Sequence, residues 1–396
     1  MNRTIEFRKQ YRGPGEGETE KILHQSERVY AKVRWRIDDD FFTYDHFERT
    51  LGYLQGTSSP GYPYLKNGTT ITDYFGTCDR YRWDEGRKRE LWSDVKNIFD
   101  REVLFRVFIK PEPHKEQKRK EKRWRLIFSS PLHFTVLGHM LFGPMRELEL
   151  DSWLDIPSSY GQSIMHGKWK LTRAMITERN LRVSVDKSAW DINAPGWVFR
   201  TKLELRTRLC ANMNQQWLQY AEYYYEQAYE HSKIIMEDGG VYQQQIDGIM
   251  KSGLATTIDD NSTAQYFIHA LASNRSNTPI GEILCVGDDT IQQTDNQEYW
   301  EQIAIAGAKV KEVTKDTREF VGMRFEDHGL FPNYTAKHLY TLSHVALEDL
   351  PQTLTSYACL YTYHPTMSKL IREIAQAMGI LLPSKQYIKY ITDVSE

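Results

Sequence analysis

The chain has 396 residues, of which 40% are hydrophobic and 26% are charged, and its formal net charge is −2. A chain of this length and composition can bury a large core and divide into two or three subdomains, which excludes a disordered protein. The near-neutral balance also excludes a uniformly basic nucleic-acid-binding domain, so any path for a polynucleotide must be a local basic stripe.

The sequence contains four cysteines, which are Cys78, Cys210, Cys285 and Cys359. They are scattered and lack the spacing of a metal site, which is typical of reduced thiols in a cytosolic protein. No apolar run approaches the ~18 residues of a membrane helix, and the first residues lack the apolar core of a signal peptide. We therefore expect no membrane span.

Residues 1–50 mix charged and aromatic side chains around a Gly-Pro-Gly turn and predict an arm that folds back on the rest of the chain. Residues 57–64, Thr-Ser-Ser-Pro-Gly-Tyr-Pro-Tyr, predict a rigid turn. The small hydroxyls and bare backbone of this turn, which include Ser59 and Gly61, would let a phosphate chain approach closely. An ordinary surface loop explains the same residues equally well.

A strongly basic segment runs from Lys110 to Arg125, with eight Lys or Arg residues against three Glu. Charge runs of this kind are usually solvated faces or flexible loops. Here apolar stretches that resemble strands, 103–109 and 126–128, bracket the run, so both of its ends are pinned inside a fold. Pinned cations close to acidic residues suit a nucleoside triphosphate, because a metal ion covers only part of its charge.

Residues 131–180 are typical of helices and connecting loops, and a Pro-Gly-Trp sequence at 195–197 opens a long predicted helical stretch that reaches about residue 230. Aromatic residues in that stretch could stack on bases, but several fall at helical spacing, which favours packing in a core. They are Trp217, Tyr220, Tyr223, Tyr224 and Tyr225.

Two acidic residues accompany a predicted strand in the middle of the chain. Leu181, Val183 and Val185 alternate with polar residues, which predicts a strand with Asp186 at its carboxyl end. Asp191 follows five residues later. The spacing Asp-x4-Asp is therefore the first candidate for chemistry.

Residues 251–262 predict a glycine-containing loop that runs into a helix. Ser252 and Gly253 lie in the loop. Thr257 and Asn261 are four residues apart, so they share one helical face near the start of the helix.

Residues 283–291 predict a short β-hairpin, with an apolar run, a Gly-Asp-Asp tip and a return into β-branched residues. Gly and Asp favour turns, so the tip taken alone favours an exposed structural turn. If the strand that ends at Asp186 lies beside this hairpin, Asp186, Asp288 and Asp289 converge on one point. Because adjacent carboxylates repel, three of them suit two Mg²⁺ ions, an arrangement that serves phosphoryl transfer.

The last third of the chain contains further elements. Residues 299–307 predict an amphipathic helix ended by a glycine, and residues 309–313 alternate as a strand. Residues 318–325 predict a second hairpin. From about residue 328 the chain is expected to be helical, through 344–350 and 367–382, with prolines 351, 365 and 383 as breaks.

The order Asp-x4-Asp, Ser-Gly-x3-Thr-x3-Asn and Gly-Asp-Asp resembles motifs A, B and C in the palm of RNA-dependent RNA polymerases of positive-strand RNA viruses. The sequences Asp-Lys-Ser-Ala-Trp-Asp at 186–191 and Arg-Trp-Arg-Leu-Ile at 123–127 are most similar to those of the sobemo-like and luteo-like group. The basic segment resembles motif F of that family, residues 57–64 motif G, residues 299–315 motif D, and residues 318–325 motif E. Each motif alone is weak, whereas the ordered set is specific.

The resemblance implies an α+β fold shaped as a right hand, in which helices flank an antiparallel palm sheet and the thumb is helical. We expect fingers with an N-terminal arm at residues 1–180. The palm would follow at 181–326, with a fingers insertion around 200–250. The thumb would comprise residues 327–396.

The implied activity is that of an RNA-directed RNA polymerase, a nucleotidyltransferase. Asp186 and Asp288 would hold two Mg²⁺ ions with Asp289 alongside, and Mn²⁺ would be able to substitute. In motif D a lysine protonates the pyrophosphate leaving group. The loose spacing there favours Lys315 slightly over Lys311, and a surface lysine is the alternative for either.

The resemblance also assigns nucleotide and RNA contacts. Lys110 and Arg125 match residues that contact the incoming triphosphate, with Arg123 assisting. The positions matched to ribose selection and nucleotide binding are Asp191, Ser252, Gly253, Thr257 and Asn261. Those expected on RNA are Ser59, Gly61, Lys118, Arg119 and Lys120.

Template and product RNA, ribonucleoside triphosphates and other viral replication proteins are the implied partners, in replication complexes of the host cytoplasm, with initiation either de novo or from a protein primer. Two alternatives stay open, a reverse transcriptase-like palm polymerase and a catalytically silent RNA-binding protein with this fold. A reverse transcriptase usually carries Tyr or Phe two positions before the Asp pair and a bulky residue at the 2′ position, where this chain has Val286 and Asn261. All the matched acids are present, which argues against a silent protein.

Overall fold

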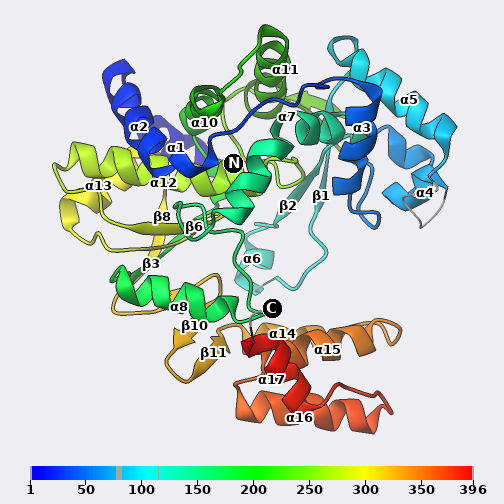
Figure 1. Ribbon diagram of the computed structural model, residues 1–396, viewed down its shortest axis with the longest axis vertical. Coiled ribbons are helices and arrows are strands. Elements are labelled where there is room, and N and C mark those ends of the chain that lie inside the picture. Colours follow the sequence, from blue (N-terminus) through cyan, green and yellow to red (C-terminus); the bar gives the residue numbers. More distant parts are fainter. Residues whose placement is uncertain (1, 77–82, 115, 395–396) are drawn as a thin grey trace.

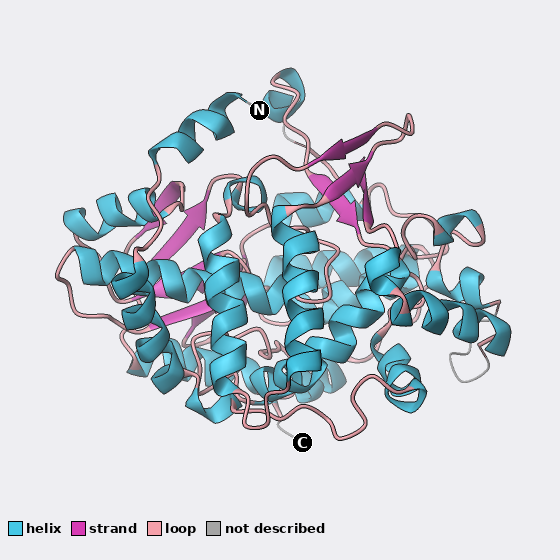
Figure 2. Ribbon diagram, turned by 90° about the horizontal axis from the view of Figure 1, so that it is seen from above, coloured by secondary structure: helices cyan, strands magenta, loops and turns pink. Residues whose placement is uncertain are grey.

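Three small sheets and the helices around them organise the computed structural model of this chain, which describes residues 2–76, 83–114 and 116–394 (Figure 1). Figure 2 shows that helices make up most of the molecule. The helices are α1 (Asn2–Gln10), α2 (Glu16–Val29), α3 (Tyr44–Thr50), α4 (Ile71–Phe75), α5 (Glu85–Lys96), α6 (Glu116–Lys120), α7 (Leu132–Asp151), α8 (Lys168–Glu178), α9 (Trp190–Asn193), α10 (Gly196–Leu209), α11 (Gln215–Tyr225), α12 (Thr257–Arg275), α13 (Gln297–Ala306), α14 (Thr335–Leu342), α15 (Leu350–Leu360), α16 (Pro365–Ala377) and α17 (Lys385–Asp393). The strands are β1 (Leu104–Ile109), β2 (Leu126–Ser129), β3 (Val183–Lys187), β4 (Lys233–Ile235), β5 (Val241–Gln243), β6 (Ile283–Val286), β7 (Asp289–Gln292), β8 (Val310–Thr314), β9 (Glu319–Phe320), β10 (Met323–Glu326) and β11 (Gly329–Pro332).

The expected palm contains a four-stranded antiparallel sheet with the strand order β6-β7-β3-β8. Strands β6 and β7 are the two arms of the predicted Gly-Asp-Asp hairpin. In the register of the sheet, Val185 of β3 pairs with Thr290 of β7 on one side and with Val313 of β8 on the other. The strand that carries Asp186 therefore lies directly beside the hairpin, as the hypothesis of converging acids requires.

Side-chain alternation in β6 joins this sheet to two separate cores. Ile283 and Cys285 belong to the core that includes α12 and α13, whereas Leu284 belongs to the core that includes α8 and β9–β11. Because successive side chains of a strand point to opposite faces, an uninterrupted apolar run is what a sheet covered on both faces requires. Figure 1 shows α12 and α13 on one side of the sheet and α8 with β10 and β11 on the other.

A second sheet, with the order β2-β1-β4-β5, holds the two ends of the basic segment. Strands β1 and β2 are antiparallel, and their last pair, Ile109 with Leu126, directly flanks the segment. Strand β4, which comes from residues 200–250, joins β1 in parallel. This part of the expected insertion thus shares a sheet with the N-terminal third of the chain.

The N-terminal arm folds back on the molecule. Helices α1 and α2 lie beside α9, α10 and α12, and the chain then crosses over to α3, next to α5 and α7 (Figure 1). Arg8 anchors the arm, because its guanidinium donates to the carbonyl oxygens of Ile192 at 2.7 Å and Ala194 at 3.0 Å. It also donates to the carbonyl of Asp247 at 2.7 Å. The arm is thus tied to the backbone that follows Asp191.

The single long helical stretch expected up to residue 230 is wrong in its middle, where α10 ends and α11 begins anew. The backbone around Cys210 pairs with the arm instead, since the Trp35 N–H donates to the Leu209 carbonyl at 3.1 Å and the Ala211 N–H donates to the Trp35 carbonyl at 2.9 Å. Asn214 then caps α11 by accepting from the Trp217 N–H at 2.8 Å. Pairing with a distant segment overrides local helical preference here.

The prediction that the aromatic residues of this stretch form core is confirmed for four of them. Trp217, Tyr220, Tyr224 and Tyr225 are buried. Tyr223 is half-buried, and its hydroxyl donates to the carbonyl of Ile98 at 3.0 Å.

Strands β9 and β10 form the hairpin expected at residues 318–325. Val321 and Gly322 at its turn have φ of +52° and +69°, as a type I′ turn requires. A third strand, β11, pairs with β10, so the helical region begins at α14 and not near residue 328.

The C-terminal region is helical, as expected, but its helix boundaries differ from the prediction. Residues 344–349 are not helical, and α15 starts at Leu350 with Pro351 in its first turn, where a missing N–H costs nothing. Helix α16 ends before residue 382 because Gly379 adopts φ +68°, a left-handed conformation that glycine tolerates.

Two further expectations concern thiols and membranes. Cys210, Cys285 and Cys359 are free thiols, and Cys78 lies outside the described residues. Among the helices of the described part of the chain, none combines the length and hydrophobicity that crossing a bilayer requires.

Candidate active site

The Gly-Asp-Asp sequence forms the two-residue turn of the β6–β7 hairpin. Val286 pairs with Asp289, so Gly287 and Asp288 are the turn residues. Gly287 has φ +61° and Asp288 does not have positive φ, which is the pattern of a type II′ turn with glycine at its first central position. Local turn chemistry thus places Asp288 at the tip and Asp289 at the first position of β7.

Two side chains from other motifs hold this turn. The N–H of Gly287 donates to Ser262 Oγ of α12 at 2.9 Å. From the opposite side, Lys187 Nζ of β3 donates to the carbonyl oxygen of Asp288 at 3.0 Å and to Thr290 Oγ1 at 2.9 Å. The position of Asp288 is therefore coupled to both β3 and α12.

Lys187 is a residue of the site that the sequence reasoning left without a role. Its side chain is 8% exposed and lies beneath the acidic turn. Burial lowers the pKa of Lys187, and Asp288, Asp289 and Asp186 oppose that shift. The signal was present in the sequence, because alternation in β3 places residue 187 on the same face as Val183 and Val185, where a lysine needs partners.

Asp186 occupies the exposed position between Val185 and Lys187 on β3. Its carboxylate pairs with Lys311 Nζ of the neighbouring strand β8, and this contact raises the pKa of Lys311. Asp186 is next to the hairpin, but its carboxylate is turned toward β8. A cation that binds Asp186 must compete with the Lys311 ammonium.

The strands of the three acids are adjacent, as predicted, but their oxygens do not form a tight cluster. Among the described residues, one group of three His, Cys, Asp or Glu side chains has its ligand atoms within 4.8 Å of one another, and it is Asp38, Asp40 and His46. Arg49 already neutralises that group, because it donates to both oxygens of Asp40 at 2.7 and 2.8 Å. We therefore do not assign a metal to it.

The pKa values of the acids near the turn reflect electrostatic repulsion between their carboxylates. Loss of hydration and the neighbouring Asp288 raise the pKa of Asp289 to about 6. Burial and the same Asp288 raise the pKa of Asp191 to about 6, although Arg125 and Lys110 oppose this shift. Carboxylates that destabilise one another in this way favour a cation.

The same balance of charges shows that the basic segment approaches the acids. Lys110 and Arg125 lie close enough to Asp191 to stabilise its charge. The two cations are fixed next to each other because the Lys110 N–H donates to the Arg125 carbonyl at 2.8 Å. The structure thus brings the predicted triphosphate contacts to the side of the acidic turn.

Glu112 is the second residue of the site, after Lys187, whose role was not predicted from the sequence. One of its oxygens pairs with Arg125 Nη1 at 2.8 Å and the other with Lys110 Nζ at 3.3 Å. Burial would raise the pKa of Glu112, but Arg125 and Lys110 outweigh burial and the net shift is downward. Lys337 of α14 lies 3.7 Å from the same carboxylate, which connects the basic segment to the C-terminal helices.

The remaining described cations of the segment lie on or beside α6 and are exposed, with the exception of Lys118. Arg119 pairs with Glu116 at 2.7 Å and Arg123 with Glu121 at 2.6 Å. Lys120 is exposed and Lys118 is half-buried. Lys115 lies outside the described residues. Of the described cations on or beside α6, none forms an ion pair with the Glu112 carboxylate.

The loop that precedes α12 packs against β2. A Cβ added to Gly253 would lie 2.1 Å from the carbonyl oxygen of Phe128, so only glycine fits there. Ser252 is exposed and its Oγ lies 3.5 Å from the Phe128 N–H. Thr257 Oγ1 lies 2.9 Å from the carbonyl oxygen of Lys251 and braces the loop. Ser252 is thus the more available of the two predicted hydroxyls.

Asn261 is buried on the first turns of α12, one turn from Thr257. The indole Nε1 of Trp190 donates to its Oδ1. Its Nδ2 lies near the acidic turn, since an added Cβ on Gly287 would be 3.8 Å away. Motifs A, B and C therefore meet at this amide.

The structure separates the two lysines of motif D. Lys315 pairs with Asp295 at 2.8 Å, whereas Lys311 contacts Asp186. Lys315 is thus not brought to the acids, and its assignment as the general acid stays a prediction.

The turn at residues 57–64 packs on the start of α7. A Cβ on Gly61 would lie 2.2 Å from the carbonyl oxygen of Ser130, so the glycine serves close packing. Gly61 is buried, and Ser59 is half-buried with its Oγ 3.3 Å from the Gly61 N–H. Contact of either residue with RNA stays a prediction.

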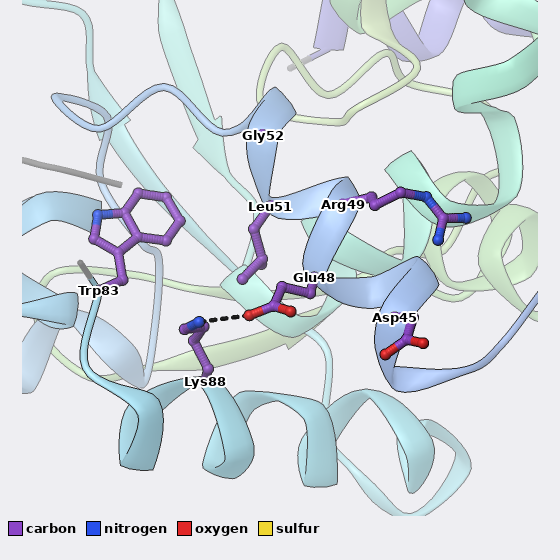
Figure 3. A pocket seen from close by; sticks show the side chains of 7 residues that line it. All are labelled: Asp45, Glu48, Arg49, Leu51, Gly52, Trp83 and Lys88. Atoms are coloured by element: carbon purple, nitrogen blue, oxygen red, sulfur yellow. Dashed lines mark hydrogen bonds and ion pairs between the residues drawn. The ribbon is translucent and has the colours of Figure 1, made fainter. Parts of the chain in front are cut away.

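A pocket of about 580 Å³ lies between α3 and α5 (Figure 3). Lys88 points at Glu48 across it, with an ion pair of 2.6 Å. Its lining residues are Asp45, Glu48, Arg49, Leu51, Gly52, Trp83 and Lys88. None of the predicted site residues lines this pocket, so we place the candidate active site at the Gly-Asp-Asp turn.

The donors at the turn fit a hard divalent cation. Asp288 and Asp289 offer carboxylate oxygens, Asp186 lies on the adjacent strand, and the raised pKa of Asp289 reflects mutual repulsion. No thiol or imidazole belongs to this set of residues. The chemistry of the donors therefore favours Mg²⁺ or Mn²⁺ over softer metals.

Comparison with known proteins gives a consistent answer. A family model described as viral RNA-dependent RNA polymerase matches residues 42–327. Protein P2-P3 of Poinsettia latent virus is 30% identical over 266 residues, which cover 60% of this chain and 22% of that protein. An RNA-directed RNA polymerase of Mushroom bacilliform virus is 26% identical over 258 residues, 60% of this chain and 61% of that one.

The replicase polyprotein P2AB of Southern cowpea mosaic virus is 27% identical over 349 residues, which cover 83% of this chain and 34% of the polyprotein. This chain thus spans less than two thirds of the length of each of these relatives. A solved structure, the Sicinivirus 3Dpol RNA dependent RNA polymerase, superposes with a TM-score of 0.74 at 16% identity and covers 96% of this chain and 86% of that one. The fold is therefore that of a right-hand polymerase.

Proposed function

Because this chain belongs to the family of viral RNA-dependent RNA polymerases, we propose that it catalyses template-directed RNA synthesis from ribonucleoside triphosphates in viral genome replication and transcription. The meeting of acids and cations at one place carries the proposal. The turn that presents Asp288 lies beside the strand of Asp186, and the paired cations of the basic segment lie within electrostatic reach of Asp191.

Two Mg²⁺ ions, or Mn²⁺ in their place, would supply the charge that activates the primer 3′-hydroxyl and neutralises the leaving pyrophosphate. Asp186 and Asp288 would hold them, with Asp289 as a weaker ligand. Lys187 and Ser262 fix the turn so that Asp288 keeps its place. A cation held by Asp186 would displace the Lys311 ammonium, which would then be free to face the phosphates.

The incoming triphosphate is proposed to replace Glu112 as the partner of Lys110 and Arg125. The guanidinium can form two parallel hydrogen bonds to phosphate oxygens, as it would to a carboxylate. Glu112 keeps both cations in place between catalytic cycles. The Arg119 and Lys120 side chains, which point into solvent, are proposed to contact RNA backbone, together with Lys118 and the turn at Ser59.

Ribose selection requires both a donor and an acceptor, because the 2′-hydroxyl that distinguishes RNA from DNA is both. Asp191 offers an acceptor and Asn261 a donor. Ser252 is exposed on the loop before α12, whereas Thr257 and Gly253 shape that loop. Watson–Crick pairing with the template would choose the base.

Replacement of Asn261 by alanine is expected to relax the preference for ribonucleotides over deoxyribonucleotides. One buried hydrogen bond to the 2′-hydroxyl is lost, so discrimination should fall by roughly 1–3 kcal/mol. The measurement is the ratio of kcat/KM values for the two sugars on one template. An unchanged ratio would remove Asn261 from ribose selection.

Lys311 and Lys315 can be separated by substitution. We propose Lys311 as the general acid, because it is the motif D lysine that reaches Asp186. Lys311→Ala should lower kcat about a hundredfold, the low end of the range for general acid catalysis. Lys315→Ala, which breaks only the exposed pair with Asp295, should change kcat less than threefold or so. Single-turnover incorporation rates of the two variants are the measurement. A larger loss in Lys315→Ala than in Lys311→Ala would restore Lys315 as the general acid.

The experiment that tests the function is extension of a labelled primer on a defined RNA template, with a second reaction that lacks the primer. Ribonucleotide-dependent extension supports the proposal, and product without primer indicates de novo initiation. Extension only with deoxyribonucleotides would favour the reverse transcriptase-like alternative. RNA binding without any synthesis would favour the silent RNA-binding protein.

We propose the host cytoplasm as the site of action, in replication complexes with other viral proteins. The free thiols of Cys210, Cys285 and Cys359 are compatible with a reducing compartment.

A further inference from the structure

Trp190 directly precedes Asp191 and is the first residue of α9. Its side chain is 2% exposed, and its indole nitrogen donates to Oδ1 of Asn261 on α12. An indole N–H can only donate, so the atom of the Asn261 amide that faces it must be the oxygen. The two faces of this amide, which are often ambiguous, are thus assigned by chemistry.

The other face of the Asn261 amide is its NH₂ group. It lies toward the acidic turn, 3.8 Å from the position of a Cβ added to Gly287. Among the described residues, no side chain or backbone group accepts a hydrogen bond from Nδ2. Trp190 therefore leaves Asn261 with a donor that points to the place where we expect the nucleotide.

The orientation of this amide decides whether a 2′-hydroxyl finds both an acceptor for its hydrogen and a donor for its oxygen. Ionised Asp191 can only accept, so the hydroxyl must donate its single hydrogen to it. The hydroxyl oxygen then needs a donor, which the NH₂ group of Asn261 provides. A flipped amide would present a second acceptor, and one of the two acceptors would stay unpaired, which costs more than the lost bond alone.

We propose that Trp190 is a positioning residue for sugar specificity, because its indole N–H locks the Asn261 amide with the donor toward the 2′-hydroxyl of the incoming ribonucleotide. The inference rests on the proposed polymerase function. Trp190 itself does not touch the nucleotide. It acts through Asn261, and its neighbour Asp191 supplies the matching acceptor from the same short helix.

The variant Trp190→Phe tests this inference, since it keeps an aromatic ring in the buried site and removes the N–H. The kcat/KM for ribonucleotides should fall roughly fivefold, as for the loss of one typical hydrogen bond, while the value for the matching deoxyribonucleotides stays unchanged. The ratio of the two values is the readout that a purely structural role would not move.

Trp197→Phe is the matched control. Trp197 is also buried, at 7% exposure, and its indole N–H donates to a backbone carbonyl, that of Ala306, at 2.9 Å. The Trp197→Phe variant therefore loses the same indole N–H, but from a site that makes no hydrogen bond to Asn261. The sugar ratio of this variant should equal that of the unmodified protein.

A double variant with Asn261→Ala completes the test. If Trp190 acts through Asn261, Trp190→Phe should not lower the sugar ratio further once the amide is gone. An unchanged ratio in the single variant, an equal loss in Trp197→Phe, or additive losses in the double variant would each overturn the inference.

Two further outcomes are distinguishable. If Trp190→Phe does not fold, Asn261→Asp replaces it, because aspartate still accepts from the indole but has no NH₂ group, and the same loss of sugar preference is expected. If the unmodified protein does not extend a primer at all, the proposed function fails and the inference fails with it, whereas an unchanged sugar ratio in a protein that does extend the primer overturns the role of Trp190 alone.

Discussion

Replacement of Asp288 by alanine is expected to lower nucleotide incorporation at least about ten-thousandfold while the protein remains folded. The carboxylate stands at the tip of the β6–β7 turn, where Gly287 and not Asp288 carries the positive φ. Alanine can therefore adopt the backbone of residue 288. What disappears is the proposed ligand of the catalytic cations, whose stabilisation of transition-state charge would be worth several kcal/mol.

The measurement is single-nucleotide extension by purified protein, with thermal unfolding to show that the fold persists. Asp327→Ala is a suitable control, because this acid also lies at a hairpin turn, between β10 and β11, and is 83% exposed in a pair with Arg318. It should retain activity within about twofold. Substantial incorporation by folded Asp288→Ala would refute the two-metal assignment.

Features that depend on neighbouring residues in the chain were predictable from the sequence. The hairpin at residues 283–291 follows from alternation and a glycine turn, and the helix that ends at Gly307 follows from amphipathic spacing. The right-hand fold and the resemblance to sobemo-like and luteo-like polymerases are confirmed by the solved structure and by the curated relatives.

Features that depend on distant partners were not predictable. Helix α10 stops at Leu209 because the backbone around Cys210 pairs with Trp35, about 175 residues earlier. No local signal at residue 210 announces that pairing. Strand β11 was likewise missed, because four residues that begin with a glycine give little periodicity until β10 supplies a partner.

The site shows the same division. The acids, the cations and the amide could be identified from motif spacing, but their partners could not. Glu112 lies two residues after Lys110, and only the β1–β2 register places Arg125 on its other oxygen. The bond from Lys187 to the carbonyl of Asp288 likewise requires β3 to lie beside β7.

Arg125→Ala is expected to lower kcat/KM for nucleotides about a thousandfold with RNA affinity nearly unchanged. Its guanidinium is held at Glu112 beside Lys110, within electrostatic reach of Asp191. Preorganised cations of this kind stabilise the charge that develops on the transferred phosphate, and removing one donor typically costs two to three orders of magnitude or so. Nucleotide kinetics at saturating RNA measure the effect.

Arg123 offers a matched comparison within the same segment. Both arginine side chains are 51% exposed, but Arg123 pairs with Glu121 and not with Glu112. If position and not charge alone determines nucleotide use, Arg123→Ala should retain at least about tenfold more activity than Arg125→Ala. Equal losses in the two variants would mean that the segment acts through its overall positive charge and not through the position of Arg125.

Substitution of Lys118, Arg119 and Lys120 by glutamine should give the opposite signature. These side chains lie on α6 and are proposed to contact RNA backbone. RNA affinity should weaken, and the slope of log affinity against log salt should flatten by up to about two, since each lost phosphate contact on a single strand releases about 0.7 counterions fewer. Nucleotide kinetics at saturating RNA should stay the same. If both this variant and Arg125→Ala lose RNA binding in parallel, without a separate nucleotide defect, the segment is a general electrostatic patch and the role of Arg125 at the triphosphate is refuted.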